Sequence, residues 1–322
     1  MNKGLKITLN ILVFVIIAGF GYYMVHSMMS DDKSLLSGGR NSENFVSPYK
    51  KTNSVTVSSD ILCFDISGNS IYVVQSGKVS VFDLAGKLLR DFAIHTDARD
   101  VAVEDTTIYL LFPSNIDLYS LEGVKKDTWE AIGNRAGYCA LTTSEDYVFV
   151  TDAENKLIYQ YDKEGRLVRF IRSPHGFIIP SYAFDIINIH DTIYCSNSGR
   201  HKVESYTIDG EYIASFGVAG TQAGSFAGCC NPAYLAATPW GDIITSEKGN
   251  PRISCFSRDG QFRTILLNSK LLGGGTQAYR IKMQDDKIYT TGKRTLSVFT
   301  CDPALAAQTA CAGCPFDCPL RR

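Results

Sequence analysis

The pattern of apolar and polar residues repeats six times between about residue 60 and residue 303. Each repeat has an apolar segment, an aromatic-bearing segment, a third alternating segment and a tight turn. The turns lie at Asp83 to Gly86, Leu121 to Gly123, Asp162 to Gly165, Asp209-Gly210, Asp259-Gly260 and Asp302-Pro303. Measured on the glycines and on Pro303, successive turns are 37, 42, 45, 50 and 43 residues apart. This period is typical of a four-stranded propeller blade and not of a helical repeat. The pattern therefore predicts an all-β, six-bladed β-propeller with antiparallel blades.

Alternation of β-branched or aromatic residues with polar ones predicts the strands of each blade. The second strands are expected at Ser70 to Ser76, Thr107 to Phe112, Tyr147 to Thr151, Thr192 to Ser196, Asp242 to Ser246 and Lys287 to Thr291. The third strands are expected at Val79 to Asp83, Ile116 to Ser120, Leu157 to Asp162, Val203 to Thr207, Ile253 to Ser257 and Leu296 to Thr300.

A fourth strand follows the turn in five repeats, as in Lys87 to Ile94, but not in the sixth. The segment Ser54 to Ser59 alternates in the same way and precedes the first repeat. Closing the ring removes an exposed sheet edge. We therefore predict that Ser54 to Ser59 pairs with Leu296 to Thr300.

The fifth repeat carries the most detailed motif. Its elements are Gly224-Ser-Phe226, Pro232, Gly241 to Ser246, Pro251 to Ile253, Phe256 and Asp259 to Phe262. They resemble the G-x-F, P, G-x-I-Y-V-x-D, N-x-R-I and F-D-x-x-G-x-F elements of the NHL-repeat family of six-bladed propellers. The resemblance covers about three quarters of the chain, with weaker versions in repeats three and four. Members of that family mostly bind proteins, nucleic acids or ligands, and a few are lyases or lactonase-like enzymes, so the resemblance does not select a function.

Composition describes an ordinary globular body. With 322 residues, of which 45% are hydrophobic and 20% charged, the chain can bury a large core. The formal net charge is −1 and no basic stripe is present. We therefore expect no nucleic-acid partner.

Residues 1–29 are predicted to be a cytoplasmic stub followed by a membrane span. The apolar run from Ile7 to Val25 can cross a hydrocarbon core of about 30 Å. Lys3 and Lys6 favour a cytoplasmic N-terminus, and the lack of a small-x-small cleavage site favours an uncleaved signal anchor over a cleaved signal peptide. Residues 30–53 are expected to be a flexible linker, and residues 54–303 an extracytoplasmic propeller. Residues 304–322 would form a Cys-rich tail.

Ten cysteines divide into three groups. Cys63, Cys139, Cys195 and Cys255 lie in predicted strands, where buried cysteine acts as a small apolar residue. Cys229 and Cys230 are adjacent in the loop that enters the fifth repeat. A vicinal disulfide would make them a redox pair; two free thiols or separate partners are the alternatives.

The third group ends the chain. Cys311, Cys314 and Cys318 follow a C-x2-C-x3-C-P spacing that is similar to the last part of a bacterial ferredoxin cluster run. The run lacks one preceding cysteine, so Cys301 would have to be the fourth ligand. Three interpretations stay open: a [4Fe-4S] cluster, two disulfides or a tetrahedral zinc site. Export favours the disulfides, whereas the spacing favours the cluster.

Motifs for catalysis are missing from the sequence. There is no G-x-S-x-G, Walker loop, dinucleotide fingerprint or HExxH. His95 and His175 occupy related loops and are expected to be solvated. No catalytic residue is therefore assigned.

Aromatic residues open the inner strands of repeats three to six. They are Tyr138, Phe184, Tyr234 and Tyr279. The starts of inner strands lie near one mouth of a propeller's channel. The rings either pack between blades or, with the neighbouring Arg99, Asp185 and Arg280, form an aromatic, charged funnel for a peptide or small polar ligand.

Three functions are compatible with these features. A membrane-tethered propeller that captures a protein or ligand outside the membrane accounts for the repeats and the anchor. An electron-transfer accessory subunit, with an iron-sulfur cluster in the tail and a protein partner in a membrane complex, accounts for the cysteines. A lactonase- or lyase-like enzyme leaves its metal ligands unassigned.

Overall fold

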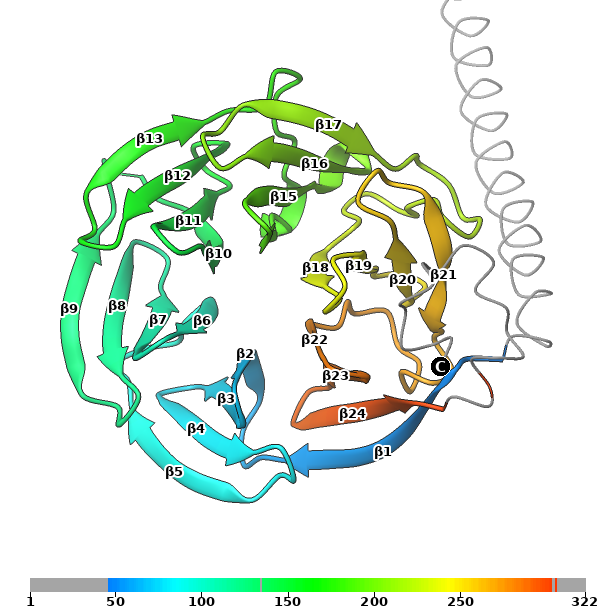
Figure 1. Ribbon diagram of the computed structural model, residues 1–322, viewed down its shortest axis with the longest axis horizontal. Coiled ribbons are helices and arrows are strands. Elements are labelled where there is room, and N and C mark those ends of the chain that lie inside the picture. The colour runs from blue at the N-terminus through cyan, green and yellow to red at the C-terminus, as the bar shows by residue number, and fades with distance from the viewer. Residues whose placement is uncertain (1–45, 134, 303–304, 306–322) are drawn as a thin grey trace, which may run out of the picture. The chain divides into compact units, whose positions relative to one another are not determined.

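The protein is a six-bladed β-propeller of four-stranded antiparallel sheets (Figure 1). The computed structural model describes residues 46–133, 135–302 and Leu305. The predicted fold class is thereby confirmed. The predicted membrane span and the cysteines Cys311, Cys314 and Cys318 lie outside the described residues. Within the described ranges, no helix has the length and apolar character needed to cross a membrane.

Each of the first five blades is built from four consecutive strands. Blades one to three contain β2 (Ile61–Ser67), β3 (Ser70–Gln75), β4 (Lys78–Asp83), β5 (Leu88–Ala93), β6 (Asp100–Glu104), β7 (Thr107–Leu111), β8 (Asn115–Ser120), β9 (Lys125–Glu130), β10 (Tyr138–Thr143), β11 (Tyr147–Asp152), β12 (Leu157–Asp162) and β13 (Leu167–Ile171). Blades four and five contain β14 (Ile186–Ile189), β15 (Thr192–Asn197), β16 (Lys202–Thr207), β17 (Tyr212–Phe216), β18 (Tyr234–Ala237), β19 (Ile243–Ser246), β20 (Ile253–Phe256) and β21 (Phe262–Leu267). Two short 3-10 helices lie in the loops, η2 (Pro180–Tyr182) and η3 (Ser198–Arg200).

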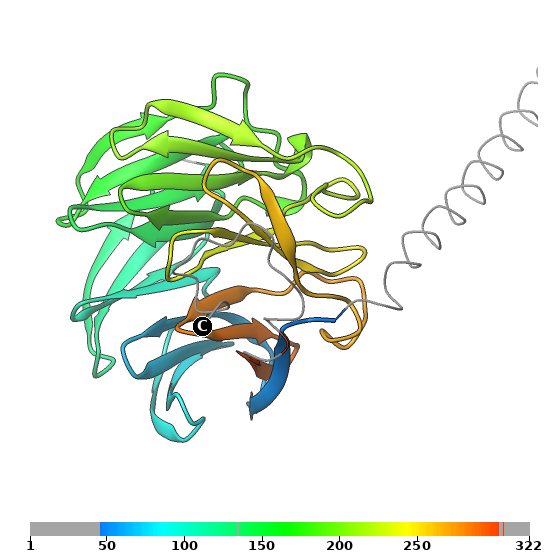
Figure 2. The ribbon, with the colours of Figure 1, turned by 45° about the vertical axis from the view of Figure 1, so that its right-hand side comes forward.

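Blade six joins the two ends of the propeller. It consists of β22 (Ile281–Gln284), β23 (Lys287–Thr291), β24 (Thr295–Cys301) and, at its outer edge, β1 (Tyr49–Thr56). In both views β1 runs beside β24, and the register pairs Ser54 with Ser297 (Figures 1 and 2). The predicted ring closure is confirmed.

The closing strand begins at Tyr49, five residues before the predicted start at Ser54. Residues 49–53, expected to be linker, therefore belong to the last blade. This part of the strand could not be predicted from the sequence, because residues 50–54 are exposed on an outermost strand, where no apolar alternation is required.

The hydrophobic core lies in layers between neighbouring blades. In β3, Ile71 and Val73 pack against blade six, whereas Tyr72 and Val74 pack against blade two. Alternate residues of one strand thus fill two different layers. This is why the second and third strands read as almost continuous apolar runs and could be placed from the sequence.

The hairpin turns also join the blades. Gly165, in the turn between β12 and β13, has a φ of +80°, and a Cβ there would lie 2.5 Å from the Trp129 ring of the preceding blade. Gly260, in the turn between β20 and β21, has a φ of +84°, and a Cβ there would lie 2.2 Å from the Cβ of Phe216 in the preceding blade. Glycine is required at these turns both for the left-handed backbone and for the close approach of the next ring.

Candidate functional site

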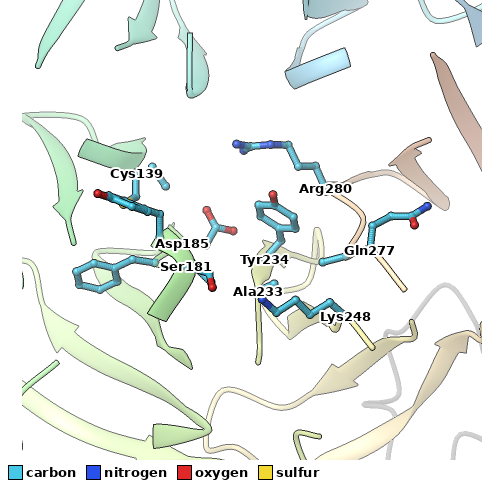
Figure 3. A pocket seen from close by; sticks show the side chains of 13 residues that line it. Cys139, Ser181, Asp185, Ala233, Tyr234, Lys248, Gln277 and Arg280 are labelled. Atoms are coloured by element: carbon cyan, nitrogen blue, oxygen red, sulfur yellow. The ribbon is translucent and has the colours of Figure 1, made fainter. Parts of the chain in front are cut away.

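A pocket of about 310 Å³ opens where the inner strands of blades three to six begin. We call it the channel-mouth pocket. Its polar wall is formed by Ser181, Asp185, Tyr234, Lys248, Gln277 and Arg280 (Figure 3). These residues come from the long loops before β14 and β22, from the start of β18 and from the residues after β19. Segments between the strands therefore supply most of the lining.

Tyr234 and Arg280 form one side of the pocket. The Arg280 guanidinium lies 4.8 Å from the centre of the Tyr234 ring (Figure 3). Arg280 also reaches across the channel to blade two, where its Nη1 lies 2.9 Å from Oδ1 of Asp100. The ion pair and the ring hold the guanidinium in a fixed orientation.

Three carboxylates, in or directly before inner strands, bridge neighbouring blades. Each accepts a backbone N–H from the next inner strand: Asp65 from Val103 at 2.8 Å, Asp100 from Leu141 at 3.0 Å and Asp185 from Leu235 at 2.6 Å. The Lys282 ammonium lies 2.8 Å from Asp65 and adds a fourth connection, from blade six to blade one. Two of these carboxylates, Asp65 and Asp100, are thus also paired with cations of blade six. The sequence analysis did not single out Asp65 or Lys282, although an aspartate within an apolar strand could have indicated a functional or structural role for Asp65.

Asp185 belongs both to this network and to the pocket. Burial, reinforced by the nearby Asp100 carboxylate, raises the pKa of Asp185 to about 7. The Leu235 N–H acts in the opposite direction but does not overcome burial. Asp185 can therefore offer a ligand either a proton or a negative charge near neutral pH.

The raised pKa of Asp185 predicts a pH dependence of stability. Between its ordinary value of 3.8 and about 7, the folded state binds more protons at this site than the unfolded state. The contribution of Asp185 to the free energy of unfolding will therefore fall as the pH rises through this window. Thermal unfolding followed against pH should show a fall in the wild type that is shallower in Asp185→Asn. Parallel curves for the two proteins would contradict the assignment.

The four predicted funnel aromatics do not share one environment. Tyr138 and Tyr279 are buried between blades, where their hydroxyls meet Tyr161 at 2.6 Å and the Gly274 carbonyl at 2.8 Å. The Phe184 ring is buried against Phe177, although the residue borders the pocket. Tyr234 is half-buried and lies on the pocket wall. Interblade packing thus accounts for three of the rings.

Arg99 lies at the edge of this region. Its Nη1 donates to the Tyr138 carbonyl oxygen at 2.6 Å, and its guanidinium lies 5.1 Å from the centre of the Tyr182 ring. Tyr182 in turn borders the pocket. Four lining residues were not predicted from the sequence, because they lie outside the regular strands: Ser181, Tyr182, Lys248 and Gln277.

The predicted histidines do not contribute to the pocket. His95 and His175 are exposed, as expected, and neither lines the pocket wall. His95 lies 3.3 Å from the buried Asp117 carboxylate, and the His175 ring packs edge-on against Tyr212.

The cysteines in the strands are buried, as the sequence predicted: Cys63, Cys139, Cys195 and Cys255. Cys301 is buried at the end of β24, and its three suggested partners in the tail lie outside the described residues. Across residues 46–133 and 135–302, no group of three or more His, Cys, Asp or Glu side chains is arranged to hold a metal ion. The three interpretations of the tail therefore stay predictions.

Cys229 and Cys230 are both thiols, with their sulfur atoms 3.0 Å apart. Cys229 is exposed and Cys230 is buried. Cys230 lies 3.8 Å from the Ser181 hydroxyl, so the pair adjoins the channel-mouth pocket.

Comparison with known proteins finds similar structures of low sequence identity. No family model matches the chain, and no curated protein matches it. Virginiamycin B lyase from Staphylococcus aureus is 12% identical with a TM-score of 0.55, over 78% of this chain and 99% of that chain. The WD40 domain of Neurospora crassa Pan2 is 9% identical with a TM-score of 0.51, over 80% of this chain and 97% of that chain. A structural genomics protein of unknown function from Bacteroides thetaiotaomicron is 11% identical with a TM-score of 0.57, over 79% of this chain and 74% of that chain. The likeness is one of fold.

Proposed function

We propose that this chain is a membrane-tethered binding propeller that captures a short peptide with a free carboxylate in the channel-mouth pocket. The observation that carries the proposal is the convergence of an aromatic ring, a fixed guanidinium, a titrating carboxyl and an ammonium on one pocket of about 310 Å³. Pockets of this size with a few directed polar groups are typical ligand sites.

Lys248 supports a carboxylate as the ligand's anchoring group. In the part of the chain that the structure describes, no Asp or Glu side chain pairs with the Lys248 ammonium. Arg280, in contrast, is already neutralised by Asp100. Lys248 is thus the cation of the pocket wall that an incoming carboxylate can pair with.

The remaining wall suits the body of a peptide. Tyr234, stacked with Arg280, offers a flat surface to an apolar side chain, and Asp185 and Gln277 can hydrogen-bond to main-chain amides. We infer the membrane tether and the extracytoplasmic location from the sequence of residues 1–29. The motif of blade five resembles those of NHL repeats. These inferences complete the proposal as a scaffold held at a membrane.

A matched pair of probes tests this proposal. A tripeptide labelled with a fluorophore at its N-terminus, with either a free C-terminal carboxylate or an amide, is titrated against the full chain in detergent by fluorescence anisotropy. We expect the free acid to bind about tenfold more tightly, equivalent to ~1.4 kcal/mol, because only it can pair with Lys248. Lys248→Met should abolish this difference, and Tyr234→Ala should weaken both probes about tenfold.

The control variant is Tyr138→Phe, since this ring is buried between blades, its hydroxyl meets that of Tyr161, and the residue does not line the pocket. It should bind both probes as the wild type does. Equal binding of the two probes by every folded variant would rule the pocket out as a carboxylate site.

A further inference from the structure

The loop between β17 and β18 holds the thiols of Cys229 and Cys230 in a defined position. Asn231 next to them is buried, and its side chain donates to the Lys248 carbonyl oxygen and accepts from the Lys248 N–H, both at 2.9 Å. The same side chain donates to the carbonyl of Ala227 at 2.5 Å. Reciprocal bonds of this kind fix the cysteine loop against the residues after β19.

The surroundings of the two sulfurs differ. Burial opposes ionisation of Cys230, but the Cys229 thiol, the Ser181 hydroxyl and the Lys248 ammonium together lower its pKa. The pKa of Cys229 is raised, chiefly because its thiol donates to the Cys230 sulfur. These interactions place the negative charge on Cys230 rather than on Cys229 when the pair loses one proton.

The cysteines in the strands lack these features. Burial raises the pKa of Cys63, and that of Cys139 to about 12. Burial also raises the pKa of Cys195. Buried thiols of this kind are inert, whereas an exposed thiol beside a stabilised thiolate is reactive. Cys229 and Cys230 are thus set apart both by position and by chemistry.

We propose that Cys229 and Cys230 form a dithiol site that reacts with small disulfides and closes to a vicinal disulfide. The reaction needs no bound peptide, but it shares Lys248 with the ligand site proposed above. The substrate class is a disulfide of the glutathione type, which is reduced to two thiols while the two cysteines are oxidised.

The geometry gives the order of the steps. Cys229 is the sulfur that solvent reaches, while Cys230 is only 1% exposed. Cys229 passes its proton to Cys230 across the 3.0 Å contact, and the Cys229 thiolate attacks one sulfur of the small disulfide. A mixed disulfide forms at Cys229, and the first small thiolate leaves.

The second step closes the ring. The departing thiolate takes the proton from Cys230, whose thiolate is stabilised by Ser181 and Lys248. Cys230 then attacks the Cys229 sulfur, the bond to the small molecule breaks, and the second small thiolate leaves and is protonated by solvent. One disulfide is consumed and one is formed, and two electrons pass from the cysteine pair to the small disulfide.

Peptide-level mass spectrometry tests the reaction in the full chain. Reduced protein in detergent is incubated with oxidised glutathione, then denatured, alkylated with iodoacetamide and digested with trypsin. Peptide 203–248 contains Cys229 and Cys230 and no other cysteine, and peptide 173–200 contains Cys195 alone. We expect peptide 203–248 to lose two hydrogens and take up no alkyl group, while peptide 173–200 stays fully alkylated.

Single variants test the order of attack. Cys230→Ser should stop at a glutathione adduct on Cys229, and Cys229→Ser should leave Cys230 as unreactive as Cys195. Lys248→Met should slow the loss of the mixed disulfide by about three- to tenfold, because the resolving thiolate is less stabilised. Two alkyl groups on peptide 203–248 of the wild type after incubation would overturn the proposal, and rapid adduct formation in Cys229→Ser would overturn the order.

Discussion

Replacing Arg252 with methionine will lower the free energy of unfolding by about 3–5 kcal/mol, because it leaves the Glu247 carboxylate buried without its partner. The side chains of Arg252 and Glu247 are 8% and 2% exposed. Their two bonds, Nε to Oε1 at 2.6 Å and Nη2 to Oε2 at 3.1 Å, form a bidentate pair. Arg252 also donates to the Thr221 carbonyl oxygen and thereby fixes the loop that leads to the cysteine pair. Chemical denaturation of the full chain measures the loss.

The double variant Glu247→Leu with Arg252→Met is the matched control. It removes both charges from the same site, so most of the lost stability should return. A double variant as unstable as Arg252→Met alone would show that the loop contacts of Arg252, and not the isolated charge, dominate.

Replacing Tyr49 with alanine will also lower the free energy of unfolding, again by about 3–5 kcal/mol, as is usual for a large aromatic side chain lost from a core. Tyr49 is 1% exposed and packs in the layer that joins blades five and six, with Leu267 and Phe299 among its neighbours. Its loss leaves a cavity at the strand that closes the ring. Thermal and urea unfolding of the variant measure the change.

Lys50→Ala is the control on the same strand. The Lys50 side chain is 62% exposed, and its ion pair with Asp302, at 2.7 Å, lies at the surface. Exposed pairs of this kind contribute about 1 kcal/mol or less. Similar losses in the two variants would mean that packing of Tyr49 does not hold the last blade closed.

The fold could be predicted because the two features that indicate it, the alternation within each strand and the glycines of the turns, are local in the sequence. Strand period and turn glycines are visible in the sequence, and every second and third strand was placed within a few residues. The start of β1 was missed because an outer strand with polar residues on an exposed edge has no apolar period.

The pocket could be predicted only in part, because its residues are selected by contacts between distant segments. Tyr138 and Tyr234 occupy the same position at the start of an inner strand. Tyr138 meets the Tyr161 hydroxyl within its own blade and is buried, whereas Tyr234 meets Arg280 of the next blade and lines the pocket. Lys248 comes from the residues after a strand, where no periodic pattern identifies a functional side chain.

The pairing of β1 with β24 has a consequence for the synthesis of the chain. Lys50 and Asp302, in contact at the edge of the last blade, are 252 residues apart in the sequence. Among the strands that the structure describes, β1 is therefore synthesised first and can pair only after β24, the last of them, has been made. Until β24 is complete, β1 and the unfinished sheet edge stay unpaired, and such edges are sites of aggregation. The exposed lysines of β1, Lys50 and Lys51, disfavour pairing of this strand with other chains during that interval.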